Sequence, residues 1–564
     1  MTATPSGYGV SPPRTYTFVP DEICIAVQTD PAHSGAIYGL VQTFLNGLTI
    51  TGGKVENLDR RDGRWSVTFV RKGETHAHLY YHWEQGNGNL DARNDSLRTL
   101  VLTINRTYAN LPAGKSATDG WQILAAAPHW IGVGAQPGGD TDSPAAPPKT
   151  GTGPKQFRFF DPALGRGNTT LQGLVDKQRT SAQSGRQSDV VVAILDTCPS
   201  QRVVQAATIR FGGSSLWQQV TRGGNRVSID GPLFLNLNQP SSVWSEILPS
   251  WMGRLNAWYT SLDAAGRTDL TRLANLRTTT YAMPDHGFFA AGIVKDIAPT
   301  ARIHLIQAID DAGLTDLLEV TDALSVLPDT LGINGDQHLI VNLSLTFSVP
   351  TFAEFLEQWS PGLTKADYDL IHFSLKDVMD WLRDDKGVCV VAAVGNYNMP
   401  EDATRPEPRF PAYYDNVFGV AAYTRQFRAA TYSNRGDEVR IVVPNGIAAL
   451  GGDTIINSAG QREINNVGDK PDAIQGIFSA VDLPFLPPSA AGTTVGSGSN
   501  KTGWVYWVGT SFAAPIITAI AAVTWDQHFG LSPAALMGSV QGFIDRGIAV
   551  RGALNCDAIW VDQV

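Results

Sequence analysis

Hydrophobic positions follow two different patterns along the chain. Up to about residue 133 they alternate with polar residues or recur at helical spacing, whereas beyond residue 188 they gather in short continuous runs. Alternation suits strands with one solvated face, and continuous runs suit parallel strands that helices cover on both faces. The pattern therefore predicts a small α+β unit followed by a larger α/β unit.

The α+β unit is expected over residues 16–133. Three of its segments have strand-like patterning, and they are EICIAV, WSVTFVR and HAHLYYHW. The segment SGAIYGLVQTFLNGL carries apolar residues at helical spacing, and LRTLVLTINRTYANL is a second candidate helix.

The larger unit is expected over residues 156–564. Its strands are predicted from the apolar runs DVVVAIL (189–195), RIHLIQAI (302–309), LIVNLSL (339–345), VCVVAAV (388–394), VFGVAAY (417–423) and VRIVV (439–443). Helical patterns lie between them, in TDLLEVTDALSVL (315–327) and ADYDLIHFSLKDVMDWLRDD (366–385). This alternation predicts a doubly wound parallel sheet, in which ligands bind beyond the carboxyl ends of the strands.

Two segments have the composition of flexible chain. Residues 1–15 are polar and contain proline, which predicts a flexible tail. Residues 134–155 are dense in Gly, Pro, Asp, Ser and Thr, which predicts a linker between the two units.

The overall composition narrows the class of protein. Of the 564 residues, 43% are hydrophobic and 17% are charged, as in globular proteins, and the net charge of −10 argues against nucleic acid or a membrane as partner. The four cysteines lie far apart without metal-ligand spacing, so no disulfide framework and no metal site are predicted. Because no signal peptide or transmembrane pattern is visible, we expect a cytoplasmic location.

Four polar residues stand at strand ends or helix starts. Asp196 follows the run VVVAIL, His286 opens HGFFAAGIV, Asn396 follows VCVVAAV, and Ser511 opens an Ala/Ile-rich helix. Serine needs a base that takes its proton, which His286 can supply, while Asp196 can hold the imidazole tautomer. The side-chain amide of Asn396 and the backbone amide of Ser511 can stabilise an oxyanion. Together these residues are the parts of an acyl-transfer site.

The segments around these residues resemble the subtilisin-like serine proteases (subtilases). GTSFAAP resembles the family's nucleophile motif GTSxAxP, DHGFFAAGI its HGxxxAG motif, AILDT its strand-end Asp motif, and AAVGN its oxyanion-hole motif. RFPAYYDNVFGVAAY and YSNRGDEVRIVVPNG resemble two further family segments, and the order Asp, His, Ser is that of subtilisin. The resemblance covers about residues 189–545. It implies a serine endopeptidase with the catalytic triad Asp196, His286 and Ser511 and with Asn396 in the oxyanion hole.

Two stretches between these residues are long for the family. Asp196 and His286 are 90 positions apart, which indicates an insertion at about 203–280. Asn396 and Ser511 are 115 positions apart, which indicates a second insertion at about 446–503. A solvated loop and a recognition element over the active site are the alternative interpretations of the first insertion.

The resemblance also points to residues that bind substrate. In subtilases an SLGG-like strand forms one wall of the pocket for P1, the residue whose carbonyl is attacked. Here the strand reads SLTF and contributes Ser344, Leu345 and Thr346. Arg409 aligns near the floor of that pocket, which suggests a preference for an acidic P1 residue through charge-assisted pairing. The alternative is an ordinary surface ion pair between Arg409 and Glu407.

The end of the first unit, GWQILAAAPHWIGVG, is similar to the last strand of subtilase prodomains. Such prodomains have a ferredoxin-like fold, assist folding and occupy the active site until they are cut, so the resemblance implies a zymogen-like enzyme. The alternative is a permanent accessory domain that binds a partner protein.

Two other functions remain open. One is a catalytically silent subtilase-fold binding or scaffold protein, and the other is a transpeptidase that uses the same triad. The expected partner of an enzyme is a peptide or protein substrate, and no cofactor is required. Many subtilases bind structural Ca²⁺, but no acidic loop of this chain identifies its ligands.

Overall fold

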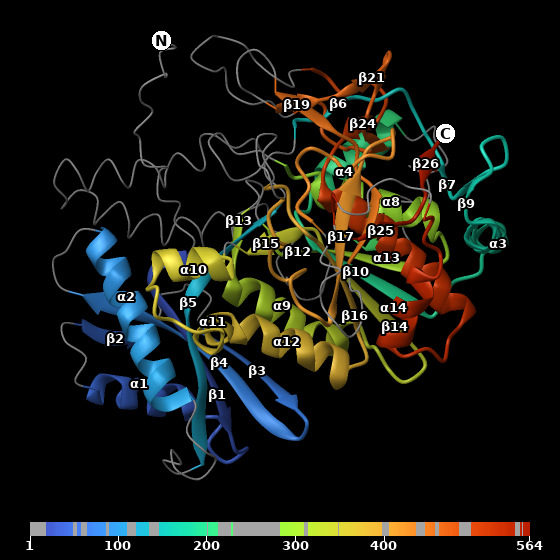
Figure 1. Cartoon of the computed structure of the whole chain (residues 1–564). Helices are drawn as coiled ribbons and strands as arrows, with labels where there is room; N and C mark the ends of the chain where they lie inside the picture. The colour runs from blue at the N-terminus through green and yellow to red at the C-terminus, as the bar shows by residue number, and fades with distance from the viewer. Residues whose placement is uncertain are drawn as a thin grey trace, which may run out of the picture.

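Figure 1 shows the computed structural model of the chain, in which a parallel sheet with its helices adjoins a smaller antiparallel sheet formed by the N-terminal residues. The structure describes residues 18–48, 53–57, 65–85, 90–109, 120–134, 146–199, 201–211, 227–228, 283–309, 314–347, 349–397, 405–435, 446–456, 462–483, 498–546, 553–554 and 556–564.

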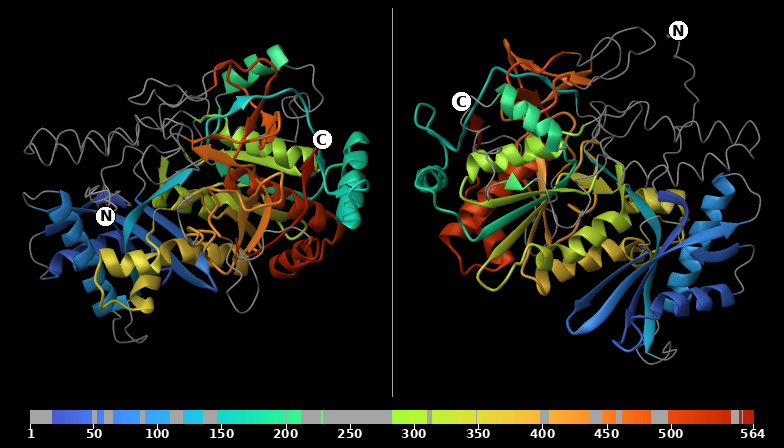
Figure 2. Two further views of the ribbon diagram at one scale, coloured as in Figure 1. Left: turned by 45° about the horizontal axis from the view of Figure 1, so that its top comes forward. Right: turned by 180° about the vertical axis from the view of Figure 1, so that it is seen from behind.

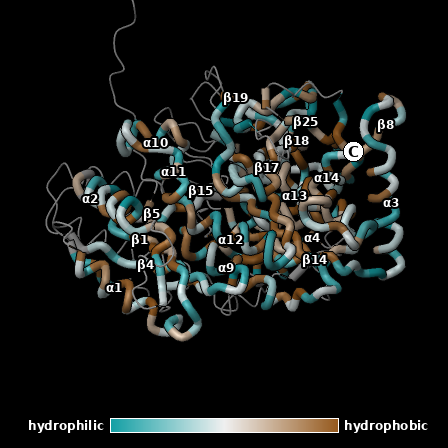
Figure 3. Tube along the Cα trace, turned by 60° about the horizontal axis from the view of Figure 1, so that its bottom comes forward, coloured by the Kyte–Doolittle hydropathy of each residue, from teal (hydrophilic) through white to brown (hydrophobic). Residues whose placement is uncertain are grey.

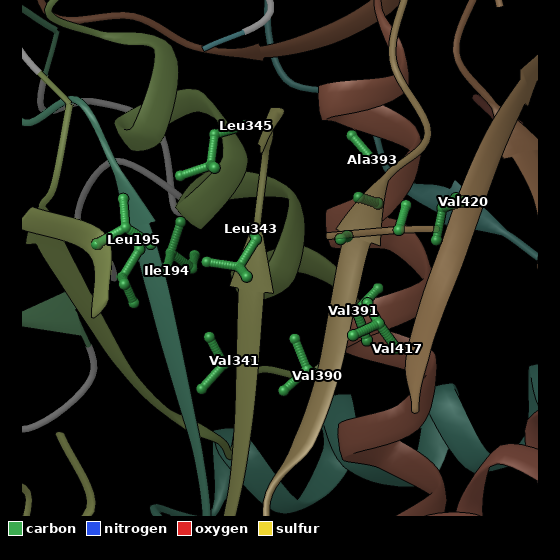
Figure 4. Close-up of a cluster of buried hydrophobic side chains, with 14 of the residues drawn as sticks. Ile194, Leu195, Val341, Leu343, Leu345, Val390, Val391, Ala393, Val417 and Val420 are labelled. Carbon is green, nitrogen blue, oxygen red and sulfur yellow. The ribbon is translucent and has the colours of Figure 1, made fainter. Parts of the chain in front are cut away.

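The larger sheet has eight strands, and every neighbouring pair is parallel. In spatial order the strands are β11 (Val227–Ser228), β12 (Arg302–Gln307), β10 (Val190–Asp196), β14 (His338–Leu343), β16 (Cys389–Ala393), β17 (Val417–Tyr423), β18 (Gly446–Leu450) and β25 (Asp557–Ala558). Because both faces are covered, strands such as β10, β16 and β17 are buried at every position. Figure 4 shows their aliphatic side chains packed between neighbouring strands. The predicted doubly wound α/β fold is confirmed.

Two helices that carry motif residues pack on this sheet. They are α8 (His286–Ile297), which contacts β10 and β12, and α13 (Thr510–Gln527), which contacts the central strands from β10 to β18. Almost every residue of α13 is buried, as expected for a helix that is hydrophobic all round. Figure 3 shows the hydrophobic segments gathered in and around the parallel sheet and α13. The helices α3 (Thr169–Gln183) and α14 (Pro533–Gln541) pack against α13.

The N-terminal sheet is antiparallel and runs in the order β5 (Trp121–Gly134), β1 (Phe18–Thr29), β4 (Glu74–Gln85) and β2 (Gly53–Asn57), with β3 (Ser66–Arg71) also paired to β4. With the helices α1 (Ile37–Gly47) and α2 (Leu90–Ile104), the order along the chain is β-α-β-β-β-α-β. Because β2 and β3 pair with successive parts of β4, they act as one interrupted strand, and the unit then has the β-α-β-β-α-β order of a ferredoxin-like fold. The three strands and the first helix predicted for this unit are therefore confirmed.

Two helices lie between the sheets (Figures 1 and 2). They are α9 (Leu317–Thr330), which contacts β3 and β5, and α12 (Phe373–Asp384), which contacts β1, β5 and β16. The N-terminal unit thus packs on the helical face of the larger unit.

The end of β5 extends this contact into the larger unit. It pairs with β13 (Leu314–Asp316) on one side and with β15 (Leu345–Phe347) on the other. Neither pairing was predicted, because strands of three residues are too short to show a period.

Several sequence predictions differ in detail from the structure. The predicted helix over 366–385 is two helices, α11 (Lys365–Ile371) and α12, with the break at His372, whose carbonyl accepts a hydrogen bond from the Tyr414 hydroxyl. The helix predicted after residue 96 changes to a π-turn, η1 (Asn105–Ala109), where the Asn105 side chain exchanges two hydrogen bonds with the backbone of Ala126. The strand VRIVV (439–443) lies outside the described residues.

The predicted loops also contain structure. Within the predicted linker, β6 (Lys149–Thr150) pairs with β24 (Trp504–Trp507), and within the predicted insertion at 446–503, β18 is a strand of the main sheet. Of the insertion at 203–280, only part of α4 (Gln201–Phe211) and β11 are described. The remaining elements are β7 (Phe157–Arg158), β8 (Phe160–Asp161), β9 (Arg166–Gly167), α10 (Phe352–Gln358), β19 (Thr454–Ile456), β20 (Arg462–Ile464), β21 (Asn466–Val467), β22 (Lys470–Pro471), β23 (Ile474–Ile477) and β26 (Asp562–Gln563). No helix among the described residues is both long and apolar enough to cross a bilayer.

Candidate active site

Asp196 and His286 form a buried hydrogen-bonded pair. Asp196 is the last residue of β10 and His286 the first of α8, and His286 Nδ1 lies 2.7 Å from Asp196 Oδ1. The same carboxylate oxygen accepts the Thr197 amide at 2.6 Å, which fixes its orientation. A Cβ on Gly287 would lie 2.3 Å from the Thr197 carbonyl oxygen, so only glycine after His286 lets α8 approach the end of β10. The structure thus brings these two predicted residues together, in the arrangement expected for a general base and the acid that orients it.

Ser511 lies in the first turn of α13, next to this pair. Its Oγ donates a hydrogen bond of 3.3 Å to the carbonyl of Ser344, and the ring of the following residue, Phe512, lies 4.9 Å from the His286 ring. His286 Nε2 is buried and has no hydrogen-bond partner among the described residues. Ser511 and His286 thus lie on two helices in contact, and no hydrogen bond joins their side chains. Such bonds are often long or absent without substrate and tighten when it binds.

Asn396 follows β16 and is fixed through its side-chain oxygen. Its Oδ1 accepts hydrogen bonds from the amide (3.0 Å) and the hydroxyl (2.8 Å) of Thr510. Its Nδ2 is buried and has no partner in the described part of the chain. The Ser511 amide, in the first turn of α13, has no intrahelical acceptor. These two donors flank the serine on which a tetrahedral oxyanion would form.

The predicted substrate-binding residues lie beside Ser511 and contact a segment of the same chain. Ser344 precedes β15, in which Leu345 is opposite Gly134 and Thr346 is opposite Val133. The residue Gly132 is opposite Thr315 on the other side, in β13. The end of β5 therefore occupies the position between β13 and β15 in extended conformation.

Arg409 is close to these residues but already paired. Its guanidinium donates to both carboxylate oxygens of Glu354, at 2.9 and 3.2 Å, and lies over the Tyr397 ring. The Tyr397 hydroxyl is 3.0 Å from Thr346 Oγ1, which links Arg409 to β15. Glu407, the partner considered from the sequence, forms its ion pair with Arg435.

Sequence reasoning missed Glu354, Thr315 and β13. The segment from residue 315 was predicted to be helical, whereas Thr315 lies in a strand and the helix begins at Leu317. A signal was present, because Asp316 and Glu319 have the spacing of a helix N-terminus, and the Asp316 side chain accepts the Glu319 amide at 2.9 Å. Among the described residues, no group of three or more His, Cys, Asp or Glu side chains could hold a metal ion.

The amino-acid sequence is similar to those of known proteins. A sequence model of the subtilase family matches residues 274–548, a segment that contains His286, Asn396 and Ser511 and begins after Asp196. The chain is 27% identical over 168 residues to the minor extracellular protease Epr of Bacillus subtilis (strain 168), covering 28% of this chain and 21% of that protein. It is 28% identical over 170 residues to the thermophilic serine proteinase of Bacillus sp. (strain AK1), covering 28% of this chain and 34% of that protein.

The chain thus spans a fifth to a third of the length of these two relatives. Among solved structures, a cold-adapted subtilisin-like serine proteinase is similar with 15% identity and a TM-score of 0.34, over 66% of this chain and 88% of that one. The family model, which covers just under half of the chain, and both relatives show that this chain is similar to the subtilases.

Proposed function

We propose that the protein is a serine endopeptidase that cleaves peptide bonds through an acyl-enzyme. The observation that carries the proposal is the buried Asp196–His286 hydrogen bond, with His286 Nε2 left unpaired against the first turn of α13. A buried ring nitrogen without a partner costs free energy, which is explained when a substrate-bound state uses it. The similarity to the subtilase family supports the same activity.

The chemistry follows from these positions. His286 Nε2 takes the proton of Ser511 Oγ as the oxygen attacks the P1 carbonyl, and Asp196 stabilises the imidazolium. Asn396 Nδ2 and the Ser511 amide bind the oxyanion. His286 then gives its proton to the leaving amine. Water takes the place of the amine, gives a proton to His286 Nε2 and attacks the acyl carbonyl, and His286 returns that proton to Ser511 Oγ as the acid product leaves.

The proposal includes a zymogen-like state in which the chain's own β5 occupies the substrate position. In the β5–β15 pair, each step back along β15 moves one residue forward along β5, with Leu345 opposite Gly134. Gly134 is the last described residue of β5, and its partner Leu345 directly follows Ser344, whose carbonyl accepts the Ser511 hydroxyl at 3.3 Å. Residue 135 lies outside the described residues. We therefore propose that it is P1 of a self-cleavage site and that the bond between residues 135 and 136 is cut.

Labelling with a fluorophosphonate and mapping of N-termini test the proposal together. The wild-type chain should be labelled and should yield a fragment that begins at residue 136, whereas Ser511→Ala should remain unlabelled and full-length. Ser539→Ala, which changes a helical serine whose hydroxyl donates to the Ala535 carbonyl of α14, is a matched control and should behave as wild type. An unlabelled wild type would support a silent scaffold instead. A labelled protein that joins peptides to added amines faster than it hydrolyses them would be a transpeptidase.

An acidic P1 preference would require Arg409 to change partners. Arg409 would have to release Glu354 before its guanidinium could pair with a substrate carboxylate. We therefore expect the preference to be small while Glu354 is present.

A further inference from the structure

The end of β5 is enclosed by two side chains at Gly132. This residue is directly opposite Thr315 of β13 on one side and Phe347 of β15 on the other. Directly opposed residues of antiparallel strands have their side chains on the same face of the sheet. A side chain at position 132 would therefore project between those of Thr315 and Phe347.

There is no room for that side chain. A Cβ on Gly132 would lie 2.6 Å from Thr315 Cγ2 and 3.1 Å from Phe347 Cε1, closer than the roughly 3.5–4.0 Å of favourable carbon contacts. Thr315 is buried and, as a β-branched residue, has restricted χ1 rotamers. Phe347 is fully buried, and its amide is held by the Phe410 carbonyl at 2.8 Å. Neither neighbour can move aside without cost.

The backbone does not itself require glycine here. Gly132 is not among the glycines with positive φ, and it lies within a regular antiparallel register. Glycine in a strand is normally unfavourable and marks a place where another group approaches closely. The approach of Thr315 and Phe347 is that reason.

We propose that Thr315 and Phe347 form a closed subsite that selects glycine in the segment bound between β13 and β15. With residue 135 as P1, Gly132 is P4, the third residue before P1. The selection of glycine in substrates rests on the proposed protease function. The closed subsite itself does not, because it can be tested through the binding of β5 alone. Phe347 occupies one of the positions at which SLTF is bulkier than the SLGG of the family.

The binding of β5 can be measured without catalysis in the full-length Ser511→Ala chain. Overpacking by Gly132→Ala should raise the hydrogen-exchange rates of amides 131–134 by roughly 10- to 100-fold. Adding Thr315→Ser, which removes the closest methyl group, should restore most of the protection. Gly39→Ala in α1 is the matched control, because nothing lies within 4 Å of its Cβ, and it should leave these amides unchanged.

Substrate selection is measured on the wild-type chain with two peptides that copy residues 129–138 and differ only in Gly or Ala at P4. We expect kcat/KM to be roughly 10- to 100-fold higher for the glycine peptide, and the ratio to fall to a few-fold in Thr315→Ser and Phe347→Ala.

Equal exchange in Gly132→Ala and in its parent, or equal cleavage of the two peptides, would overturn the closed subsite. If neither peptide is cut while the exchange results hold, the subsite stands and the proposed protease function fails.

Discussion

The side-chain amide of Asn396 is held at one end and unpaired at the other. Its Oδ1 accepts two hydrogen bonds from Thr510, whereas its buried Nδ2 has no partner among the described residues. If Nδ2 stabilises only the transition state, Asn396→Leu should lower kcat for a fluorogenic peptide by roughly 100- to 1000-fold while KM changes little.

Thr510→Val is the control for this prediction. It removes one of the two bonds to Oδ1 but leaves Nδ2 in place, so kcat should fall only a few-fold. Losses of the same size in both variants would mean that Asn396 acts by positioning the start of α13 and not as an oxyanion donor.

The ion pair between Arg409 and Glu354 sets a second expectation at this scale. Although burial raises it, the pairing with Arg409 and the Thr351 hydrogen bonds hold the pKa of Glu354 below its ordinary value, so this carboxylate neutralises the guanidinium at neutral pH. In Glu354→Gln the cleavage of peptides with Asp or Glu at P1, relative to a neutral residue, should increase by roughly 10-fold. Kinetics on paired peptides measure this ratio. Glu407→Gln, which removes the partner of Arg435, should not change this ratio. An unchanged ratio in both variants would mean that Arg409 does not bind the P1 side chain.

Functional residues could be found from the sequence where the structure around them also restricts the residues next to them in the chain. Gly287 must follow His286 because α8 touches Thr197, and this local constraint produces a readable motif. Glu354 was not found, because its partner Arg409 lies 55 positions away in the chain. No sequence motif distinguishes such a pair from the charged residues of an ordinary surface.

At the scale of elements, a buried cluster joins β3 and β4 of the N-terminal sheet to α12. The Asp377 carboxylate, fully buried, is bonded by Arg71, by His76 Nδ1 at 2.7 Å and by His78 Nε2 at 3.1 Å. Breaking a buried pair by removing one partner typically costs about 3–5 kcal/mol. Asp377→Asn in the Ser511→Ala chain should therefore loosen the N-terminal unit, seen in thermal unfolding as a lower or separate transition.

A second position on α12 provides the control. Asp384 is partly exposed, and its ion pair with Arg383 should contribute at most about 1 kcal/mol, so Asp384→Asn should change the transition little. Equal shifts for the two substitutions would show that the cluster around Asp377 does not hold the units together.

Helices and strands long enough to show a pattern of hydrophobic positions were predictable, and shorter ones were not. The seven residues of β10 and the eighteen of α13 show their burial in sequence, whereas β13 and β15 have three residues each and depend on β5 for their hydrogen bonds. Similarly, β18 was placed in an insertion because its GIAAL sequence is short and lies beside Gly-rich segments. These short segments become strands because they pair with segments distant in the chain.

At the scale of the whole molecule, His129 is a further contact between the two units. His129 of β5 is buried, with Nδ1 2.7 Å from Glu22 of β1 and Nε2 3.1 Å from Asp316, the N-cap of α9. Tyr80 of β4 packs against the ring. Burial alone would lower the pKa of His129, but the charges and hydrogen bonds of Asp316 and Glu22 outweigh it and raise the pKa from 6.5 to about 9. A neutral ring would instead accept the Leu318 amide, 3.3 Å from Nε2, and would lose its charge interaction with Glu22 and Asp316.

The sign of the pH dependence follows from this raised pKa. The stabilisation is complete below the ordinary value of 6.5 and is lost as the pH rises through about 9, when the folded state also releases the proton. The shift corresponds to about 3 kcal/mol, so the full-length Ser511→Ala chain should become less stable between pH 6.5 and pH 9. Denaturant unfolding at a series of pH values measures this. His129→Gln should be less stable at pH 6.5 and nearly independent of pH over this range. His33→Gln, which changes a half-buried ring of the same unit that contacts Asp30, should retain the wild-type slope. A slope that survives in His129→Gln would mean that other groups titrate as the units separate, and His129 would then be a neutral residue of the interface.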